Sequence, residues 1–231
     1  MLKMTSLLDN LIDVIYPACC IACDSILVSQ EKLICTGCIV ELTPTDFHKY
    51  ENNPVARKFY GKVKIEKAMA YFPFVKKGKV QKILHNLKYR DEESLSEMLG
   101  LWYGRYLISE NLNTQFDVII PIPLHPKKLL KRGYNQSDGF AKGLAKSLNT
   151  DWKSDIICRN KETSTQTKKT RIQRWYNVKG IFSITNKEYV RDKKILLVDD
   201  VVTTGATIES CANILLAENA KSVSIATIAY A

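Results

Sequence analysis

The sequence predicts an α/β fold in which a mainly parallel sheet is flanked by helices. Residues 195–198 form a continuous apolar run, which is typical of a strand buried on both faces of a parallel sheet. Two carboxylates and a loop with glycine follow it, and then come apolar residues that share one helical face, namely Ile208, Cys211, Ala212 and Leu215. Because ligands in open α/β sheets bind beyond the carboxyl ends of the strands, we expect the functional site directly after Val198.

The length and the charge limit the class of protein. A chain of 231 residues with 45% apolar residues is globular, and we expect a small unit at residues 1–45 and a main domain at 46–231. Lys and Arg number 34 against 24 Asp and Glu, which gives a formal net charge of +10. This excess indicates an anionic partner, either pyrophosphate, a phosphorylated sugar or nucleic acid, without choosing among them.

The first fifteen residues predict a short amphipathic helix that packs on its own protein. Its apolar residues recur at helical spacing, and they are Leu7, Leu8, Leu11, Ile12 and Ile15. Charged residues interrupt this stretch, so it is neither a secretory signal nor a membrane span, and no later stretch is long enough to cross a bilayer. We therefore expect a cytoplasmic protein with reduced thiols.

Four cysteines predict a structural zinc site. Cys20 and Cys23 form one Cys-x-x-Cys motif, and Cys35 and Cys38 form a second one eleven residues later. Two such turns can close a tetrahedral site with four thiolates and no open position, with residues 25–29 and 32–34 as short strands of a zinc ribbon. A redox pair or buried reduced thiols are the alternatives. Cys19 competes with Cys20 as a ligand, but Cys20 keeps the two-residue spacing.

The remaining elements follow from periodicity. Residues 42–61 are polar and predict a connector, and residues 159–177 are polar and basic, which predicts a mobile loop over the site or a surface excursion. Cys158 and Cys211 stand alone and predict core packing. Strands are predicted at 63–74, 116–123, 178–182 and 222–230, and helices at 77–89, at 95–108 and from Asn135 and Gln136 onward with Phe140, Leu144, Ala145 and Leu148 on one face.

A basic loop is predicted at residues 125–136, at the C-terminal end of the strand at 116–123. Gly133 permits close backbone approach to a ligand, and Arg132 can bind pyrophosphate with two donors, while Lys128 and its neighbours Lys127 and Lys131 act as point charges. The stretch is also compatible with a solvated basic turn.

Residues 199–207 predict a site for a ribose 5-phosphate. A helix N-terminus favours a phosphate, Gly205 and Ala206 let the backbone approach it, and the hydroxyls of Thr203, Thr204 and Thr207 add donors. Asp199 and Asp200 can accept hydrogen bonds from sugar hydroxyls, either directly or through Mg²⁺ and water. Taken singly, the acidic pair could be a turn and the Thr-Thr-Gly an ordinary loop.

These residues closely resemble the phosphoribosyl pyrophosphate-binding motif of type I phosphoribosyltransferases, in which an apolar strand is followed by Asp-Asp, two variable positions and Thr-Thr-Gly-Ala-Thr. The whole chain resembles the ComF family of competence-related proteins, although Asp24 stands where the ribbon often has glycine. The segments that carry this resemblance are Tyr16-Pro17 before the cysteines, residues 87–90, residues 121–123 with 132–136, Gln166 with Arg174 and Asn177, and residues 198–207.

The resemblance implies a type I phosphoribosyltransferase-like core with an N-terminal zinc ribbon. It implies transfer of phosphoribosyl from phosphoribosyl pyrophosphate with Mg²⁺ to an unknown acceptor, with Asp199, Asp200 and Arg132 at the reacting groups and Arg174 adding charge from the basic segment. Family members in competent bacteria are linked to single-stranded DNA and to DNA uptake. A single-stranded DNA-binding protein and a sensor of phosphoribosyl pyrophosphate without turnover are therefore the two rival hypotheses.

Overall fold

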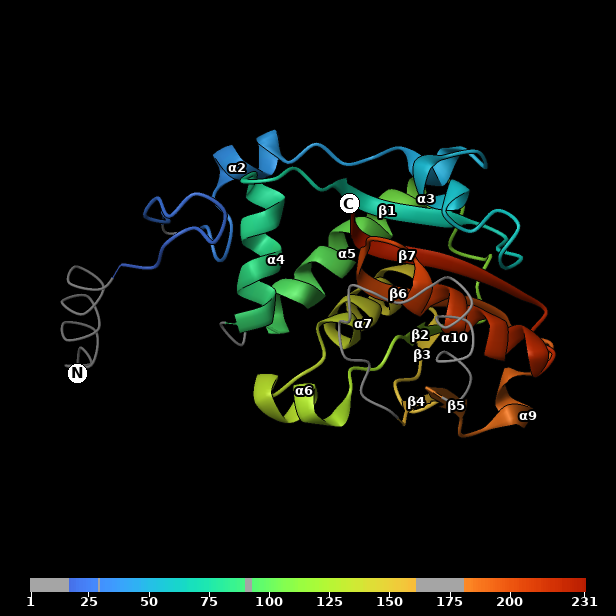
Figure 1. The fold of residues 1–231 in the computed structure, drawn as a ribbon. Coiled ribbons are helices and arrows are strands. Elements are labelled where there is room, and N and C mark those ends of the chain that lie inside the picture. Colours follow the sequence, from blue (N-terminus) through green and yellow to red (C-terminus); the bar gives the residue numbers. More distant parts are fainter. Residues whose placement is uncertain (1–16, 29, 90–92, 161–180) are drawn as a thin grey trace, which may run out of the picture.

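The computed structural model describes residues 17–28, 30–89, 93–160 and 181–231 (Figure 1). The helix expected within residues 1–15 lies outside these ranges, and so do Arg174 and most of the basic segment expected at 159–177. Among the described residues, no helix is both long and apolar enough to cross a membrane.

A five-stranded sheet forms the centre of the fold, and every pair of neighbouring strands in it is parallel. The order is β1 (Ala68–Pro73), β7 (Ser222–Tyr230), β6 (Lys194–Val202), β2 (Val118–Pro121) and β3 (Asp151–Trp152). Residues 195–198 of β6 are fully buried, which is the environment that their apolar run predicts. The predicted parallel α/β sheet is confirmed.

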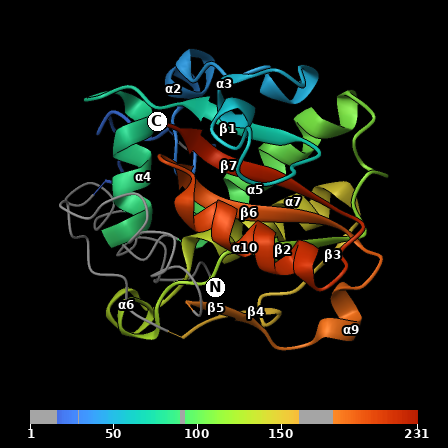
Figure 2. The same ribbon diagram turned by 45° about the vertical axis from the view of Figure 1, so that its right-hand side comes forward.

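Helices cover both faces of this sheet (Figures 1 and 2). Leu196 and Val198 point into a core with α4 (Lys79–Tyr89), α5 (Glu93–Ser109) and α7 (Gln136–Leu148). Ile195 and Leu197 point into a second core with α3 (Pro54–Arg57) and α10 (Ala206–Ala217). The apolar face predicted for α10, and the one predicted for the helix after Asn135, are both buried.

A small antiparallel pair of strands lies apart from the main sheet. It consists of β4 (Ile157–Arg159) and β5 (Phe182–Ile184), and the short helix α9 (Lys187–Val190) follows it. Cys158 is exposed on β4, although its isolation predicted core packing, because the neighbouring Ile157 points the opposite way and takes the buried face. Cys211 is fully buried, as predicted.

Several short helices stand where the sequence predicted strands or loops. We call residues 19–41 the cysteine segment. It forms an isolated bridge between Cys19 and Ile26 instead of ribbon strands. The helix α2 (Thr36–Glu41) begins at the second motif because the Cys35 side chain caps its N-terminus. The polar connector holds η1 (Phe47–Lys49) and α3. β1 is shorter than the strand predicted at 63–74. The division at residue 45 stays a prediction, and the cysteine segment shares one core with α4 and α5.

The basic stretch at 125–136 is largely helical instead of a loop. The helix α6 (Pro126–Arg132) begins at Pro126 because proline is favoured in the first turn and because the His125 ring accepts a hydrogen bond from the Lys127 amide. Gly133 ends it with a φ of 79°.

The contact between α5 and α7 depends on glycines. A Cβ on Gly143 would lie 2.1 Å from the Glu97 carbonyl oxygen, and a Cβ on Gly100 would lie 2.3 Å from the Phe140 carbonyl oxygen. Both neighbours are backbone atoms of a helix, so neither can move aside without shifting the helix. The close approach of these two helices therefore requires glycine at both positions.

We predict that Gly143→Ala lowers the free energy of unfolding by about 1–3 kcal/mol through overpacking. Denaturant unfolding followed by circular dichroism measures this loss. Gly37→Ala in α2 is the matched control, because a Cβ there has no atom within 4 Å and alanine favours the helix. Equal stability of the two variants would contradict the packing argument.

Candidate functional site

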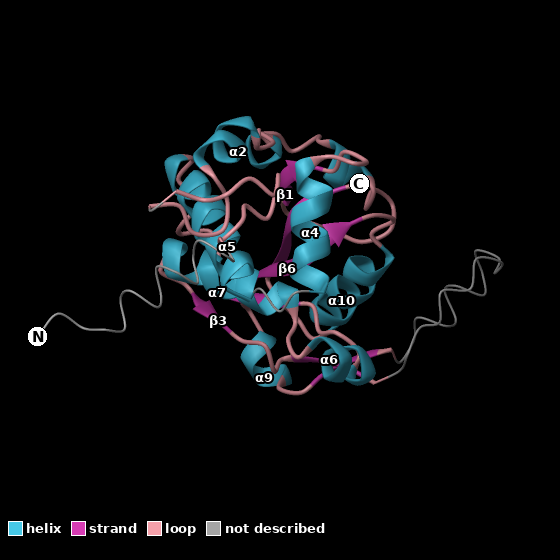
Figure 3. Ribbon diagram, turned by 90° about the vertical axis from the view of Figure 1, so that its left-hand side faces the viewer, coloured by secondary structure: helices cyan, strands magenta, loops and turns pink. Residues whose placement is uncertain are grey.

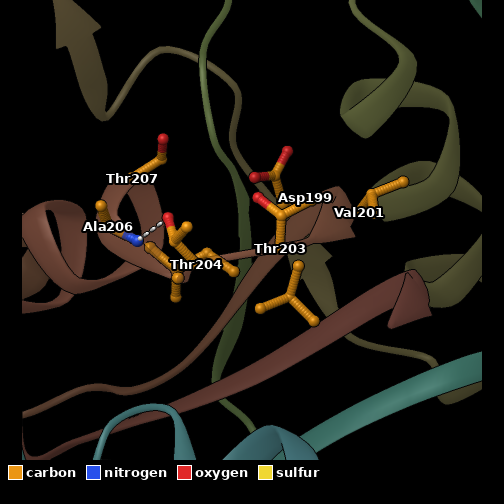
Figure 4. A pocket seen from close by; sticks show the side chains of 9 residues that line it. Asp199, Val201, Thr203, Thr204, Ala206 and Thr207 are labelled. Atoms are coloured by element: carbon orange, nitrogen blue, oxygen red, sulfur yellow. Dashed lines mark hydrogen bonds between the residues drawn. The ribbon is translucent and has the colours of Figure 1, made fainter. Parts of the chain in front are cut away.

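A hollow lies where β6 ends and α10 begins (Figure 4). The empty space of about 220 Å³ in it includes open solvent, so the hollow suits a phosphate group better than a large ligand. Figure 4 shows the Asp199 carboxylate and the hydroxyls of Thr204 and Thr207 around it. The lining residues are Asp199 and residues 201–208, which include all five positions predicted to bind phosphate, Thr203, Thr204, Gly205, Ala206 and Thr207. We call residues 203–207 the cradle.

The cradle exposes backbone donors because Gly205 occupies the N-cap of α10. Its φ of 79° suits glycine, and no side chain caps this helix end. The first amides of α10 therefore have no intrahelical acceptor, and the helix dipole adds partial positive charge. The Ala206 amide lies 3.5 Å from the Thr204 hydroxyl, a long contact that leaves it accessible to a better acceptor. Thr203 and Thr204 are exposed, so both hydroxyls can reach a bound anion.

The floor under the cradle is the ring of Phe59. A Cβ on Gly205 would lie 2.9 Å from Phe59 Cε1, and Phe59 itself is 1% exposed. Two independent constraints therefore require glycine at position 205, namely the backbone conformation and the contact with Phe59. The sequence indicated the first requirement and contained no sign of the second.

The two carboxylates at the end of β6 have different neighbours. Asp199 lines the hollow, and its Oδ1 accepts hydrogen bonds from the Ser137 hydroxyl at 3.2 Å and the Asp200 amide at 2.9 Å. Asp200 is not among the residues that line the hollow, and its Oδ2 lies 3.0 Å from Lys88 Nζ. Burial and then the nearby Asp200 carboxylate raise the pKa of Asp199 to about 7. A cation placed beside the two carboxylates would offset this repulsion and favour the ionised pair.

Lys88, near the C-terminal end of the helix labelled α4 in Figure 3, supports this acidic pair. Lys88 pairs with Asp200, and the Leu87 carbonyl accepts hydrogen bonds from Gln136 Nε2 at 3.0 Å and from the Tyr134 hydroxyl. Gln136 Oε1 in turn accepts from Arg132 Nη1 at 2.8 Å. These contacts connect the end of α6 to the end of α4. Sequence reasoning assigned no site role to Lys88 or Ser137, because each bonds a residue far away along the chain.

The other predicted residues of the basic stretch divide into exposed and buried ones. Lys128 and Gly133 are exposed, and Arg132 is half-buried. Asn135 is buried at the N-cap of α7, where its Nδ2 donates to the Ile122 carbonyl at 3.1 Å and to Asp138 Oδ1 at 2.6 Å. Asn135 thus holds α7 against β2, and the cations of α6 remain the available anion contacts on this side.

The four predicted zinc ligands come together. The sulfur atoms of Cys20, Cys23, Cys35 and Cys38 all lie within 4.8 Å of one another, and Cys23 and Cys35 are 3.7 Å apart. Four thiolates at tetrahedral corners ~2.3 Å from zinc would be ~3.8 Å apart, so the cluster matches such a site. The Cys35 amide donates to Cys20 Sγ at 3.3 Å and the Cys38 amide to Cys35 Sγ at 3.4 Å, which orients the sulfurs. Cys19 lies outside the cluster and contacts the Pro17 carbonyl.

Comparison with known proteins agrees with this geometry. Residues 131–231 match the phosphoribosyl transferase domain. The chain is also similar to the DNA utilization protein YhgH of Escherichia coli O157:H7, with 31% identity over 150 residues that cover 62% of this chain and 63% of that protein. The chain therefore spans less than two thirds of that relative's length.

Two other relatives carry competence names. Competence protein F of Haemophilus influenzae is 35% identical over 100 residues, which cover 43% of this chain and 44% of that protein. Competence protein ComFC of Bacillus subtilis is 34% identical over 110 residues, which cover 48% and 42%. The matched region, residues 131–231, contains the acidic pair, the cradle and all of α7, whereas the cysteine cluster lies before it.

We predict that the purified protein binds one zinc ion at the cysteine cluster. Metal analysis after zinc loading should give one zinc per chain for the wild type, and Cys20→Ser should lose it with a lower melting temperature. Cys19→Ser is the matched control, because Cys19 is the adjacent cysteine and lies outside the cluster. Loss of zinc from both variants alike would contradict this assignment.

We predict that Gly205→Ala distorts the cradle of the phosphoribosyltransferase domain. The added Cβ is strained at positive φ and lies too close to Phe59, so the variant should lower the free energy of unfolding by about 1–3 kcal/mol. Gly61→Ala separates the two causes, because Gly61 also has a positive φ, of 69°, but open space around its Cβ. Gly205→Ala should lower the free energy of unfolding more than Gly61→Ala does. Adding Phe59→Leu to Gly205→Ala should restore part of this difference. An equal cost at the two glycines would show that the Phe59 contact is unimportant.

Proposed function

We propose that the protein binds phosphoribosyl pyrophosphate with Mg²⁺ and transfers its phosphoribosyl group to an acceptor, with release of pyrophosphate. One observation carries this proposal, which is that a half-buried carboxylate and an uncapped helix N-terminus line the same hollow. Donors for a phosphate beside an acceptor for sugar hydroxyls are the chemistry of a pentose 5-phosphate. The match to the phosphoribosyl transferase domain supports the same ligand.

Each group at the site has a role in this proposal. Residues 203–207 hold the 5-phosphate, and Asp199 and Asp200 hold the ribose hydroxyls and the Mg²⁺ ion. The bound Mg²⁺ supplies positive charge to the ribose and pyrophosphate oxygens. Arg132 and Lys128 from α6 hold the leaving pyrophosphate, with Arg132 fixed by its hydrogen bond to Gln136. Arg174 lies outside the described residues, and its role stays a prediction.

The chemical step breaks the bond between the anomeric carbon and the pyrophosphate oxygen. In the transition state the sugar is cationic and the leaving group is anionic, so fixed cations around the pyrophosphate lower the barrier. The acceptor supplies the electron pair of the new bond, and pyrophosphate leaves with the old one. The carboxylates at the ribose also stabilise positive charge that develops in the ring.

Binding of single-stranded DNA is the second candidate function. The relatives named for competence and for DNA utilization favour it, and the formal net charge of +10 gives it an electrostatic basis. A sensor that binds phosphoribosyl pyrophosphate without turnover would use the same cradle. The reduced thiols that a zinc cluster requires accord with the cytoplasmic location that the sequence predicts.

We predict that calorimetric titration detects binding of phosphoribosyl pyrophosphate in the presence of Mg²⁺. Asp199→Asn and Asp200→Asn should each weaken binding about tenfold or more, because they remove a charge that holds the cation. Glu188→Gln is the matched control, since its carboxylate lies on α9 at the opposite end of β6 and pairs with Arg191.

The outcomes separate the hypotheses. Release of pyrophosphate with an added acceptor supports the enzyme, and binding without release under every acceptor supports the sensor. Absence of binding heat in the wild type would overturn both, because each requires the sugar pyrophosphate in the cradle.

A further inference from the structure

We infer that the surface around α3 binds single-stranded nucleic acid. We call Tyr50, Arg57, Lys58, Tyr60 and Lys62 the α3 surface. This inference rests on the second candidate function, and it names the residues that would perform it. Aromatic rings for stacking and unpaired cations for phosphates are the two features that such binding requires.

The aromatic rings are the first observation. Tyr50 and Tyr60 are 61% and 60% exposed, which makes them the most exposed tyrosines among the described residues. The Tyr60 hydroxyl lies 3.5 Å from Asn52 Oδ1, which holds the ring by its edge. Tyr71 and Tyr103, by contrast, stack on each other within the core. A ring fixed at one edge and open to solvent is suited to stack on a base.

The unpaired cations are the second observation. Arg57 Nε donates to Asn52 Oδ1 at 2.9 Å, Lys58 Nζ donates to the Ala231 carbonyl at 3.0 Å, and Lys62 Nζ donates to the Lys58 carbonyl at 2.6 Å. The acceptors of Arg57 and Lys62 are neutral, whereas the oxygen that Lys58 contacts belongs to Ala231, the last residue of the sequence. In the part of the chain that the structure describes, no salt bridge reaches Arg57 or Lys62. The lysines that do pair with carboxylates there are Lys49, Lys79, Lys82, Lys88, Lys142, Lys146 and Lys187.

The stretch around α3 carries an excess of basic residues. Residues 50–67 contain five basic residues against two acidic ones, Glu51 and Glu66. This local excess of positive charge attracts a polyanion, and binding releases the counterions condensed on it. The α3 surface therefore offers contacts to a chain of phosphates as well as to bases.

Buried Asn53 makes this surface rigid. Its Nδ2 donates to the carbonyl oxygens of Tyr50 at 2.8 Å, Phe47 at 3.0 Å and Ala68 at 2.8 Å. Its Oδ1 caps α3 by accepting from the amides of Val55 and Ala56. The segment before α3 and the first turn of α3 are thus tied to β1, beside which Figure 1 shows the helix. Such preorganisation lowers the entropic cost of binding.

The α3 surface borders the cradle. Phe59, between Lys58 and Tyr60, forms the floor under Gly205, and Lys58 Nζ lies 4.8 Å from the ring centre of Tyr230 at the end of β7. A strand bound on the α3 surface would therefore lie next to the phosphate donors of α10. A duplex hides the faces of its bases, so the exposed tyrosines favour a single strand.

The test is fluorescence anisotropy with a labelled single-stranded thymidine oligonucleotide and the zinc-loaded full chain. Tyr60→Ala should weaken binding about fivefold or more, because it removes the ring on which a base stacks, while Tyr60→Phe should retain binding. Arg57→Gln combined with Lys62→Gln should also weaken it and reduce the salt slope by about 1.4, or about 0.7 for each phosphate that the protein no longer neutralises. Lys142→Gln combined with Lys146→Gln removes the same charge from lysines of α7 that already pair with Glu97, and it should leave the slope unchanged.

The results distinguish this surface from the sugar-phosphate site. Tyr60→Ala should bind phosphoribosyl pyrophosphate as the wild type does, so weakening confined to the oligonucleotide supports the α3 surface. If the wild type binds the oligonucleotide but not the sugar pyrophosphate, the enzyme proposal is overturned and this surface stands. Equal weakening by the α7 control, equally tight binding of a duplex, or no oligonucleotide binding by the wild type would overturn the inference.

Discussion

The site depends on how β6 ends. Up to Val198 the strand is buried on both faces, and its side chains alternate between the core of α3 and α10 and the core of α4, α5 and α7. The polar residues that follow have partners on different elements, since Asp199 lines the hollow before α10 and Asp200 pairs with Lys88 on α4. Two adjacent carboxylates therefore connect the cradle to the opposite layer of the fold. A shift of one residue along the strand would exchange their neighbours and remove the site.

The helix α4 connects the acidic pair to the segment that contains the four cysteines. Near its N-terminal end, Lys79 pairs with Glu41 and Lys82 pairs with Asp24, both of which belong to the cysteine segment. Near its C-terminal end, Asn86 Nδ2 lies 3.4 Å from the Ile21 carbonyl, while Leu87 and Lys88 contact Gln136 and Asp200. The same helix is thus bonded at several points to the cysteine segment and at its last turn to the acidic pair. Whatever fixes the cysteine segment also restricts the position of Lys88 beside Asp200.

The sequence predicted the fold and the glycine turn into α10 well because both depend on local patterns. The apolar run before Asp199 determines a buried parallel strand, and the Thr-Thr-Gly-Ala-Thr segment determines a glycine turn into a helix. The spacing of the cysteines likewise selected Cys20 over Cys19 for the cluster. The ribbon strands and the loop at 125–136 were wrong because caps at Cys35, His125 and Gly133 favour short helices there. Lys88, Ser137 and Phe59 were not predicted as site residues, since each acts through a contact with a residue distant in the chain.

The electrostatics of the acidic pair bear on the cation proposed for this site. Burial and the Asp200 charge both disfavour ionised Asp199, which raises its pKa to about 7, and one lysine on Asp200 does not offset this effect. An ordinary surface carboxylate is fully ionised at about pH 7, and a nearby cation would stabilise it only a little. A divalent cation beside Asp199 and Asp200 would instead neutralise repulsion that the fold imposes. The fold therefore holds together two carboxylates that repel each other, and this repulsion is why the proposed Mg²⁺ ion and its pyrophosphate ligand would bind there.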